Sequence, residues 1–425
     1  MSTDVLVYVE LGGDDVLAGQ LFSHRRRGSE SASFRYDNGY LARPDAYALD
    51  PQLTLVSGTQ QTEVGLKLFR AFADSAPDRW GRNLFLRRER LRAREFTSTM
   101  RSFAEFDFLL AVRDDLRQGS LRFRSPDDGV FLASEATGVP LLTDLPTLLG
   151  AAERLDRDSA GYADLQTLVR AGSSLGGARP KAHLRDPDSG ALAIAKFPRS
   201  ASDRWNVMAW EKTALDLARA CGIDTPKNQL ISVDGRDVLV VERFDRRDER
   251  RIGYTSALTW LEATDGEQRT YLEIASVVEE RSPSPTTDLA QLWRRLVFNI
   301  LISNSDDHLR NHGFLHAGGD AWRLSPAFDL NPNPDPGPKQ LSTAIDSGDP
   351  AARIDTALSV AALFRLDPAE ARHILSDVAT VCSSWRVTAR RNGLAGAQLD
   401  AMAPAFEHDQ ADQARRVIHG DTDAP

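Results

Sequence analysis

The spacing of apolar residues changes along the chain from strand-like to helix-like, and this change most constrains the fold. Residues 5–11 (VLVYVEL) alternate apolar and polar side chains, and residues 16–22 follow a GGDD turn, which predicts a β-hairpin. Residues 289–301 instead carry apolar side chains every three or four positions, which predicts a helix with a broad buried face. Strands dominate before residue 245 and helices after it, so we expect an α+β protein.

We expect three parts in this chain of 425 residues. Residues 1–135 read as a small α+β subdomain, in which Pro77 suits the first turn of a helix over residues 83–96. Residues 136–245 read as a strand-rich lobe with a glycine-rich loop, and residues 246–425 as a helical lobe with clustered carboxylates. This order predicts two lobes that hold a nucleotide between them.

The composition predicts a soluble, cytoplasmic protein. Hydrophobic residues make up 41% and charged residues 27% of the chain, and no apolar run is long enough to cross a membrane. The N-terminus lacks the basic start of a signal peptide. A formal net charge of −9 argues against a dedicated nucleic-acid-binding surface. The cysteines, Cys221 and Cys382, are too few for a disulfide framework, so we expect buried thiols.

A polar cluster, NSDDHLRNHGFL, follows the apolar helix at residue 304. His308 and His312 are four residues apart, a spacing that zinc proteases use on a helix. Those enzymes place a glutamate directly after the first histidine, whereas Leu309 stands there in this chain, and no third ligand is evident. We therefore expect the two histidines to pack or to orient neighbouring groups within a loop.

Phosphoryl transfer accounts for more of the cluster. It needs a carboxylate that accepts the proton of the attacking hydroxyl and hard oxygen ligands for Mg²⁺. Asp306 and Asn311 have the D-x-x-x-x-N spacing of a kinase base and metal ligand, and Asp329 follows a hairpin predicted from GFLH and AWRLS. Asp307 competes for the role of base, but only Asp306 fits the spacing. The alternative is a polar surface loop without catalytic function.

A glycine-rich loop, AGSSLGGARPKA, precedes a predicted strand. Its small residues allow backbone N–H groups to approach phosphates closely. The loop is not a Walker A motif, because Ala178 stands where the lysine is required. The alternative is a turn in which the serines bond locally. The candidate phosphate-binding residues are Gly172, Ser173, Ser174, Gly176 and Gly177.

The chain has six lysines, so the position of each one is informative. Lys181 ends the glycine-rich loop, and Lys196 lies in the apolar strand ALAIAK, where ATP phosphates would be a suitable partner. Glu211 on the following helix is a candidate partner for Lys196, and a lysine that extends to water is the alternative. The strand VVERF runs into the helical half, so its backbone is expected to meet adenine. The residues concerned are Val241, Glu242 and Phe244.

Taken together, these motifs resemble those of HipA-type serine/threonine kinases, the toxin half of HipBA toxin–antitoxin modules. The resemblance rests on GSSLGGARPKA, AIAKFP, VVERFDR, NSDDHLRNHGFL and LSPAFDLNP, and on YLARP and FADSAPDRWGR in the N-terminal part. It extends in order over residues 5–379. It implies a two-lobed protein-kinase-like fold with an additional N-terminal α+β subdomain.

The resemblance also implies ATP and Mg²⁺ as cofactors. Asp306 matches the catalytic base of the family, Asn311 and Asp329 its metal ligands, and Lys196 its ATP-contacting lysine. We also place His308 among the nucleotide contacts. Ser174 matches the autophosphorylated serine, with Ser173 as the alternative, and in the family this modification expels the loop and stops the enzyme.

The family resemblance further implies partners. Family members phosphorylate aminoacyl-tRNA synthetases, with glutamyl-tRNA synthetase as the known type of target, and bind a HipB-like helix-turn-helix antitoxin. We expect this chain to meet DNA only through such an antitoxin, and to bind no membrane. Two other functions remain open at this point. They are a small-molecule phosphotransferase of kinase fold and a kinase-dead corepressor that acts with its antitoxin.

Overall fold

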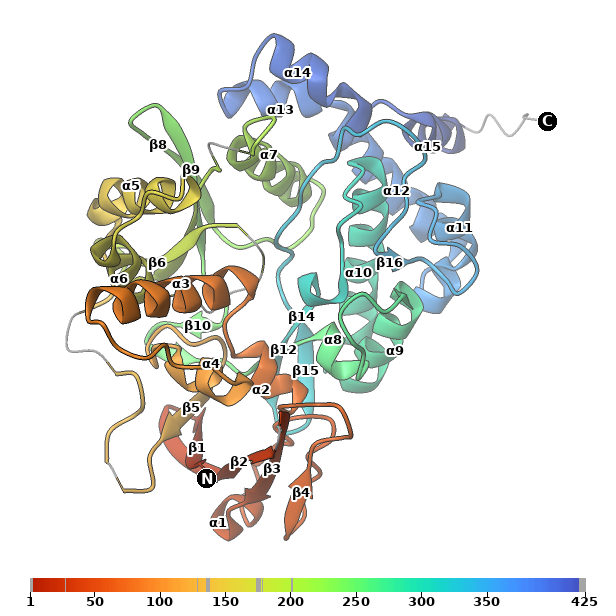
Figure 1. The fold of residues 1–425 in the computed structure, drawn as a ribbon. Helices are drawn as coiled ribbons and strands as arrows, with labels where there is room; N and C mark the ends of the chain where they lie inside the picture. The colour runs from red at the N-terminus through yellow and green to blue at the C-terminus, as the bar shows by residue number, and fades with distance from the viewer. Residues whose placement is uncertain are drawn as a thin grey trace. The chain divides into compact units, whose positions relative to one another are not determined.

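The structure is a computed structural model that describes residues 3–26, 28–127, 129–134, 138–172, 177, 179–199 and 202–419. By its contacts the chain divides into two compact units. Figure 1 shows the fold, coloured from the N-terminus to the C-terminus. Unit 1 comprises Met1–Asp203, Ser232–Thr255 and Gly318–Asp320, and unit 2 comprises Arg204–Ile231, Ser256–Ala317 and Ala321–Pro425. Residues 204–231 of the expected strand-rich lobe thus group with unit 2, and the functional division into three parts remains a prediction.

The first sheet of unit 1 confirms the predicted N-terminal hairpin. Strands β1 and β2 are antiparallel, with Val5 opposite Leu21 and a register shift between Val7 and Tyr8. Val5, Val7 and Val9 are buried because alternate side chains point to one face of the sheet. The strand order is β4-β3-β2-β1-β5. The strands are β1 (Thr3–Leu11), β2 (Asp14–Arg26), β3 (Ser29–Tyr36), β4 (Thr59–Gln61) and β5 (Leu121–Arg124).

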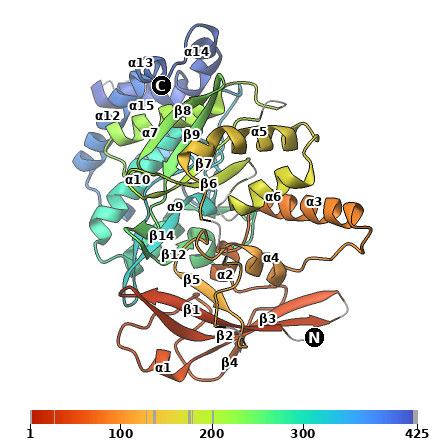
Figure 2. The same cartoon turned by 90° about the vertical axis from the view of Figure 1, so that its left-hand side faces the viewer.

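The described helices of unit 1 all follow β3 in the sequence, and Figure 2 shows α2 and α4 close to this sheet. The helix predicted over residues 83–96 is present as α3, but it begins four residues earlier, at Arg79, and Pro77 precedes its N-cap Asp78 instead of lying in its first turn. The side chain of Asp78 accepts a hydrogen bond from Gly81 N at 2.7 Å and so caps the helix. The helices are α1 (Asn38–Leu41), α2 (Arg70–Asp74), α3 (Arg79–Glu95), α4 (Glu105–Ala111), the 3₁₀ turn η1 (Leu142–Asp144), α5 (Leu145–Asp156) and α6 (Tyr162–Arg170). Helix α3 contacts α6, and α5 contacts α6.

A second antiparallel sheet of unit 1 carries the candidate nucleotide-binding residues. Its neighbouring strands β6 (Lys181–Arg185), β7 (Leu192–Lys196) and β9 (Arg236–Glu242) place Lys181 opposite Lys196 and Ala195 opposite Val240. Ala182, Leu184 and Leu239 are completely buried. A short hairpin of β10 (Arg246–Arg247) and β11 (Arg250–Arg251) follows β9.

Buried charges join the N-terminal part of unit 1 to the end of β9. The Arg243 guanidinium donates to Leu116 O at 2.7 Å and to Arg117 O at 3.0 Å. Asp245 accepts from Arg243 at 2.6 Å and from Gly119 N at 2.8 Å. Burial would raise the pKa of Asp245, but Arg243 and Arg246 hold it well below its usual range. Residues 116–119 are therefore fixed to the second sheet by paired charges.

Unit 2 is built around helix α10, which contacts α9 and α12 (Figure 1). The buried face of α10 includes Leu292, Trp293 and Leu296, as the apolar spacing predicted. Stacked rings of Trp385 and Phe406, 4.7 Å apart, pack with Trp210 of α7. The main helices are α7 (Val207–Ala220), α8 (Ala257–Trp260), α9 (Tyr271–Arg281), α10 (Pro285–Leu301), α11 (Ile354–Ser359), α12 (Pro368–Ser383), α13 (Trp385–Arg391), α14 (Ala397–Met402) and α15 (Asp409–His419).

Short strands and 3₁₀ turns complete the fold. The hairpin predicted from GFLH and AWRLS is confirmed as β14 (Gly313–Gly318) and β15 (Ala321–Leu324). The remaining elements are β8 (Asn228–Val233), β12 (Tyr254–Ser256), β13 (Arg269–Thr270), β16 (Thr343–Ala344), η2 (Leu309–Asn311), η3 (Ala361–Phe364) and η4 (Ala403–Ala405). Within the described part of the chain, no helix has the length and apolar character needed to span a bilayer.

Candidate active site

The segment after α10 carries the predicted base. The helix ends at Leu301, and Ser303 adopts a left-handed backbone with φ of 53° that turns the chain out of the helix. Asp306 is exposed, and its backbone oxygen accepts hydrogen bonds from His308 N at 2.9 Å and from the Asn311 side-chain nitrogen at 3.2 Å. The two predicted residues Asp306 and Asn311 are thus brought together by a compact turn.

The surroundings of the Asp306 carboxyl group raise its pKa. Its pKa is raised by partial burial and then by the charges of Asp329 and Asp307, while His308 opposes the shift. Two like charges close enough to disfavour ionisation are a common arrangement where a cation or a proton is to be held. Asp306 and Asp329 therefore lie near each other within unit 2, as the sequence predicted.

Asp307 is placed differently from its neighbour in sequence. It is 3% exposed, accepts a hydrogen bond from the Tyr271 hydroxyl, and lies 3.0 Å from His312 Nε2. Burial alone would raise the pKa of Asp307, but His312 and the hydrogen bonds from His312 and Tyr271 outweigh it and lower the pKa. A buried carboxylate with these partners cannot reach an attacking hydroxyl, so the geometry favours Asp306 as the base.

The predicted metal ligands provide a donor set that suits Mg²⁺. Asp329 has a left-handed backbone with φ of 57°, which is costly for a residue other than glycine. Asn311 uses its side-chain nitrogen toward Asp306 O, which directs its amide oxygen elsewhere. The Asp329 carboxylate and the Asn311 amide oxygen are hard oxygen donors of the kind that Mg²⁺ prefers. The residues present fit the ion.

Both histidines of the cluster, His308 and His312, are at least partly buried. His312 is 2% exposed, and its ring meets the Tyr271 ring edge-on at a centroid distance of 5.2 Å. His308 is half-buried next to Asp306. Across the described residues, no group of three or more histidine, cysteine, aspartate or glutamate side chains is arranged to hold a metal. The magnesium site predicted here uses Asn311 and Asp329, with Asp306 as the neighbouring base, and so is a different kind of site.

Only the ends of the glycine-rich loop belong to the described residues. Ser173, Ser174 and Gly176 lie outside them, so their predicted roles are untested. At the start of the loop, Gly172 has φ of 87°, and a Cβ there would lie 2.5 Å from His183 Nδ1 and 2.7 Å from Leu116. Glycine is therefore required at this position for both backbone and packing reasons.

The end of the loop is held by two ion pairs. Arg179 donates to both carboxylate oxygens of Asp203 at 2.9 and 2.7 Å. Lys181 Nζ lies 2.6 Å from Asp78, with side chains 3% and 7% exposed. Burial raises the pKa of Asp78, and Lys181 opposes this shift. Sequence reasoning identified Lys181 but not its carboxylate partner, which is 103 residues away.

The remaining predicted nucleotide contacts lie in the second sheet of unit 1. Lys196 ends β7 and is partly exposed, directly opposite Lys181. Val241 and Glu242 end β9, and Phe244 follows, with its ring 6.3 Å from that of Tyr254. Lys196 belongs to unit 1 and Glu211 to unit 2, and their pairing stays a prediction. The contacts of these residues with nucleotide likewise remain predictions.

Sequence reasoning missed the polar residues that surround Asp307. Tyr271 donates to Asp307, and Asn299 donates to Tyr271 at 3.0 Å. One signal was present in the sequence, because Thr270 and Glu273 form a capping box that marks the start of α9. It locates the helix, but it does not show that Tyr271 faces the catalytic segment.

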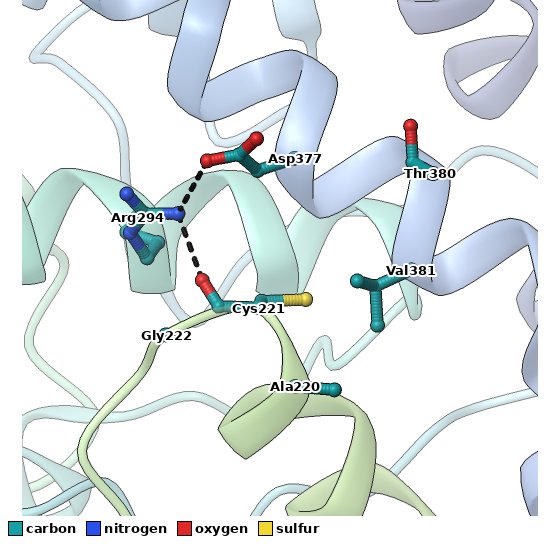
Figure 3. A pocket seen from close by; sticks show the side chains of 7 residues that line it. All are labelled: Ala220, Cys221, Gly222, Arg294, Asp377, Thr380 and Val381. Atoms are coloured by element: carbon teal, nitrogen blue, oxygen red, sulfur yellow. Dashed lines mark hydrogen bonds and ion pairs between the residues drawn. The ribbon is translucent and has the colours of Figure 1, made fainter.

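A surface pocket in unit 2 involves other residues (Figure 3). It has a volume of about 420 Å³ and is lined by Ala220, Cys221, Gly222, Arg294, Asp377, Thr380 and Val381. Arg294 donates to Cys221 O at 2.8 Å, at the end of α7, and lies 3.5 Å from Asp377. Both cysteines are buried, as expected. None of the predicted site residues lines this pocket.

The fold and the catalytic segment define a protein of protein-kinase-like fold with an additional N-terminal subdomain, as expected from the sequence. Two family models match, the HipA N-terminal domain over residues 10–123 and the HipA-like C-terminal domain over residues 173–385. The chain belongs to the HipA family.

Two curated relatives of this chain have kinase names. A Sinorhizobium fredii protein named "Putative kinase Y4mE" is 29% identical over 224 residues, which are 48% of this chain and 50% of the relative. A "Putative kinase" of Haemophilus influenzae is 24% identical over 135 residues, which are 28% of this chain and 39% of the relative. The chain thus spans half or less of the length of these curated relatives.

A solved structure matches over nearly the whole chain. The HipA protein of Shewanella oneidensis MR-1, determined in a complex with HipB and operator DNA, has a TM-score of 0.65 and 15% sequence identity. The match covers 98% of this chain and 97% of the HipA chain. At this level of identity the match establishes the fold.

Proposed function

We propose that this chain is an ATP- and Mg²⁺-dependent serine/threonine protein kinase and the toxin of a toxin–antitoxin system. The observation that carries the proposal is the grouping of Asp306, Asn311 and Asp329 at one place in unit 2, where Asp329 helps to raise the pKa of Asp306. Membership of the HipA family and the kinase names of the curated relatives support it.

Asp306 would act as the general base. In the reaction, the oxygen of a serine or threonine hydroxyl bonds to the γ-phosphorus of ATP, the bond to the bridging oxygen breaks, and ADP leaves. The hydroxyl proton passes to a carboxylate oxygen of Asp306, whose exposure allows this contact. Asn311 and Asp329 would hold Mg²⁺, which when bound neutralises charge on the phosphates.

Unit 1 would supply the nucleotide contacts. Lys196 is proposed to contact the phosphates, with the backbone of the glycine-rich loop. Residues 241–244 would meet adenine, and His308 would complete the nucleotide contacts from unit 2. Because Asp78 already engages the Lys181 ammonium, Lys181 would contribute mainly by holding the loop end.

The proposed partners follow from family membership. The protein substrate would be a translation component, with an aminoacyl-tRNA synthetase as first candidate, and Ser174 or Ser173 would be the site of autophosphorylation. A helix-turn-helix antitoxin would connect the chain to DNA. The HipB and operator DNA found with the Shewanella HipA protein support this partner.

Transfer of label from ATP tests the proposal. The purified chain would be incubated with γ-labelled ATP and MgCl₂, alone and with a bacterial lysate from cells that lack the antitoxin. We expect label in the chain at Ser174 or Ser173 and in a lysate protein. Asp306→Asn should lower the rate at least ~10²-fold, the usual minimum for loss of a general base. Asp320→Asn, in an exposed turn, is the matched control and should keep the wild-type rate.

Two other results would contradict the proposal. Wild-type protein that labels neither itself nor any lysate protein would indicate a corepressor without kinase activity. Label that enters metabolites but no protein would indicate a small-molecule phosphotransferase.

A further inference from the structure

Five polar residues, all buried or half-buried, are connected by hydrogen bonds next to the proposed catalytic residues. The path runs from Asp307 through Tyr271 on α9 and Asn299 on α10 to Asn304 and Asn331. Asn304 donates to the Asn299 amide oxygen at 3.0 Å, and Asn331 N donates to the Asn304 amide oxygen at 3.4 Å. The Asn331 side chain also donates to Asp329 at 3.4 Å. The path therefore joins the neighbour of the base to a proposed metal ligand.

The direction of donation along this path follows from elementary chemistry. An ionised carboxylate can only accept, so the Tyr271 hydroxyl must give its one proton to Asp307. The hydroxyl oxygen must then accept from the Asn299 amide nitrogen, which leaves the Asn299 oxygen to accept from Asn304. From Asn304 to Tyr271 each donor thus points toward Asp307, whereas the Asn331 side chain donates in the other direction, to Asp329. Bonds aligned in one direction polarise and strengthen one another.

Two residues with left-handed backbones lie next to this path in the sequence. Ser303, directly before Asn304, and Asp329, two residues before Asn331, both have left-handed backbones. Such conformations persist only where the surroundings over-determine them. Tyr271, Asn299 and Asn304 are at most 1% exposed, so water cannot replace a lost bond at these positions.

We propose that Tyr271 is a positioning residue for phosphoryl transfer: through Asp307 on one side and Asn299, Asn304 and Asn331 on the other, it fixes the distance between Asp306 and Asp329. This inference rests on the proposed function, because it concerns the same site. The Asp306 and Asp329 carboxylates repel each other before a cation arrives, and the tyrosine and asparagine side chains of the path carry no charge of their own.

Tyr271→Phe is the decisive variant. It removes the hydroxyl but keeps the ring that packs against His312. Mn²⁺ would replace Mg²⁺ as a spectroscopic probe, and its binding in the presence of a non-hydrolysable ATP analogue would be measured by electron paramagnetic resonance. We expect Mn²⁺ affinity and the rate of label transfer at saturating ATP each to fall about 10–100-fold, the range for residues that orient metal ligands. Binding of the ATP analogue without metal should be unchanged.

Tyr47→Phe is the matched control. It removes an equally buried hydroxyl, bonded to Ser120 at 2.9 Å in unit 1, and should leave Mn²⁺ affinity and rate at wild-type values. Asn331→Ala is the second variant, in case Tyr271→Phe fails to fold. It breaks the link to Asp329 at a half-buried position, and should weaken Mn²⁺ binding with little loss of stability.

The outcomes separate the two proposals. Wild-type Mn²⁺ affinity and rate in both Tyr271→Phe and Asn331→Ala would overturn the positioning role and leave the kinase function intact. A wild-type chain that binds Mn²⁺ but transfers no phosphate would overturn the kinase function, while weaker Mn²⁺ binding in Tyr271→Phe would still support the positioning role. A wild-type chain that neither binds Mn²⁺ nor transfers phosphate would overturn both.

Discussion

The end of the glycine-rich loop and the catalytic segment are both held by side chains from distant parts of the sequence, but by different chemistry. The loop end relies on charges, with Lys181 paired to Asp78 and Arg179 paired to Asp203. The proposed catalytic segment has charged contacts too, between Asp307 and His312 and between Arg310 and Asp265, but its buried links to α9 and α10 are made by amides and a hydroxyl that carry no charge. The difference indicates that a buried ion pair fixes the loop end, whereas uncharged hydrogen bonds fix the helices next to the residues that are proposed to hold a cation.

The largest expected effect comes from breaking the buried pair at the loop end. Asp78→Asn removes the carboxylate that lies 2.6 Å from the buried Lys181 ammonium, so we expect a loss of about 3–5 kcal/mol in the free energy of unfolding. Urea denaturation would measure it. The double variant Asp78→Leu with Lys181→Met should recover most of the loss, because two apolar side chains leave no unpaired charge. A loss under about 1 kcal/mol in Asp78→Asn would mean that the ammonium finds water, as a surface pair does.

An intermediate effect is expected from the uncharged path. Asn299→Ala removes two buried hydrogen bonds and should lower the free energy of unfolding by about 1–3 kcal/mol, equally at low and high salt. Urea denaturation in 0.1 and 1 M NaCl would measure both properties. Gln291→Ala on the same helix is the control, since its bonds are exposed and its loss should cost about 0.5 kcal/mol or less. A strong salt dependence for Asn299→Ala would contradict the distinction between the two regions.

The smallest effect is expected from the second pair at the loop end. Arg179 and Asp203 are 28% and 12% exposed, so Arg179→Gln should cost about 0–1 kcal/mol at low salt and nothing measurable in 1 M NaCl. The same denaturation series would test this. A loss that persists in 1 M NaCl would show that the bidentate geometry matters more than the charges do.

Local patterns predicted much of the fold and part of the site. The spacing of Asp306 and Asn311 identified two residues that the structure brings together, and the pattern after Pro77 identified α3, although its start was placed four residues too late. These signals are local because helices and tight turns depend on nearby residues. The sequence left Asp307 as a rival base that does not fit the spacing, and the burial of its side chain also separates the two carboxylates.

The rest of the site depends on tertiary contacts that leave no local trace. Asp78 caps α3, and its second role, the ion pair with Lys181, depends on a residue 103 positions away in β6. Tyr271 is the first residue of α9, and the role of its hydroxyl depends on Asp307, 36 residues later in the sequence. The role of a side chain that contacts two elements is determined by how those two elements pack.

We expect the buried cluster of Arg243 and Asp245 to make the N-terminal subdomain necessary for folding of the strand-bearing unit. Backbone oxygens of Leu116 and Arg117 accept from the Arg243 guanidinium, and Gly119 N donates to Asp245. A shortened gene that starts at residue 124 would deprive these charges of partners in the interior of the strand-bearing unit. Such a fragment should collect in inclusion bodies, and recombination between relatives would have to exchange both sequences together to yield a working protein.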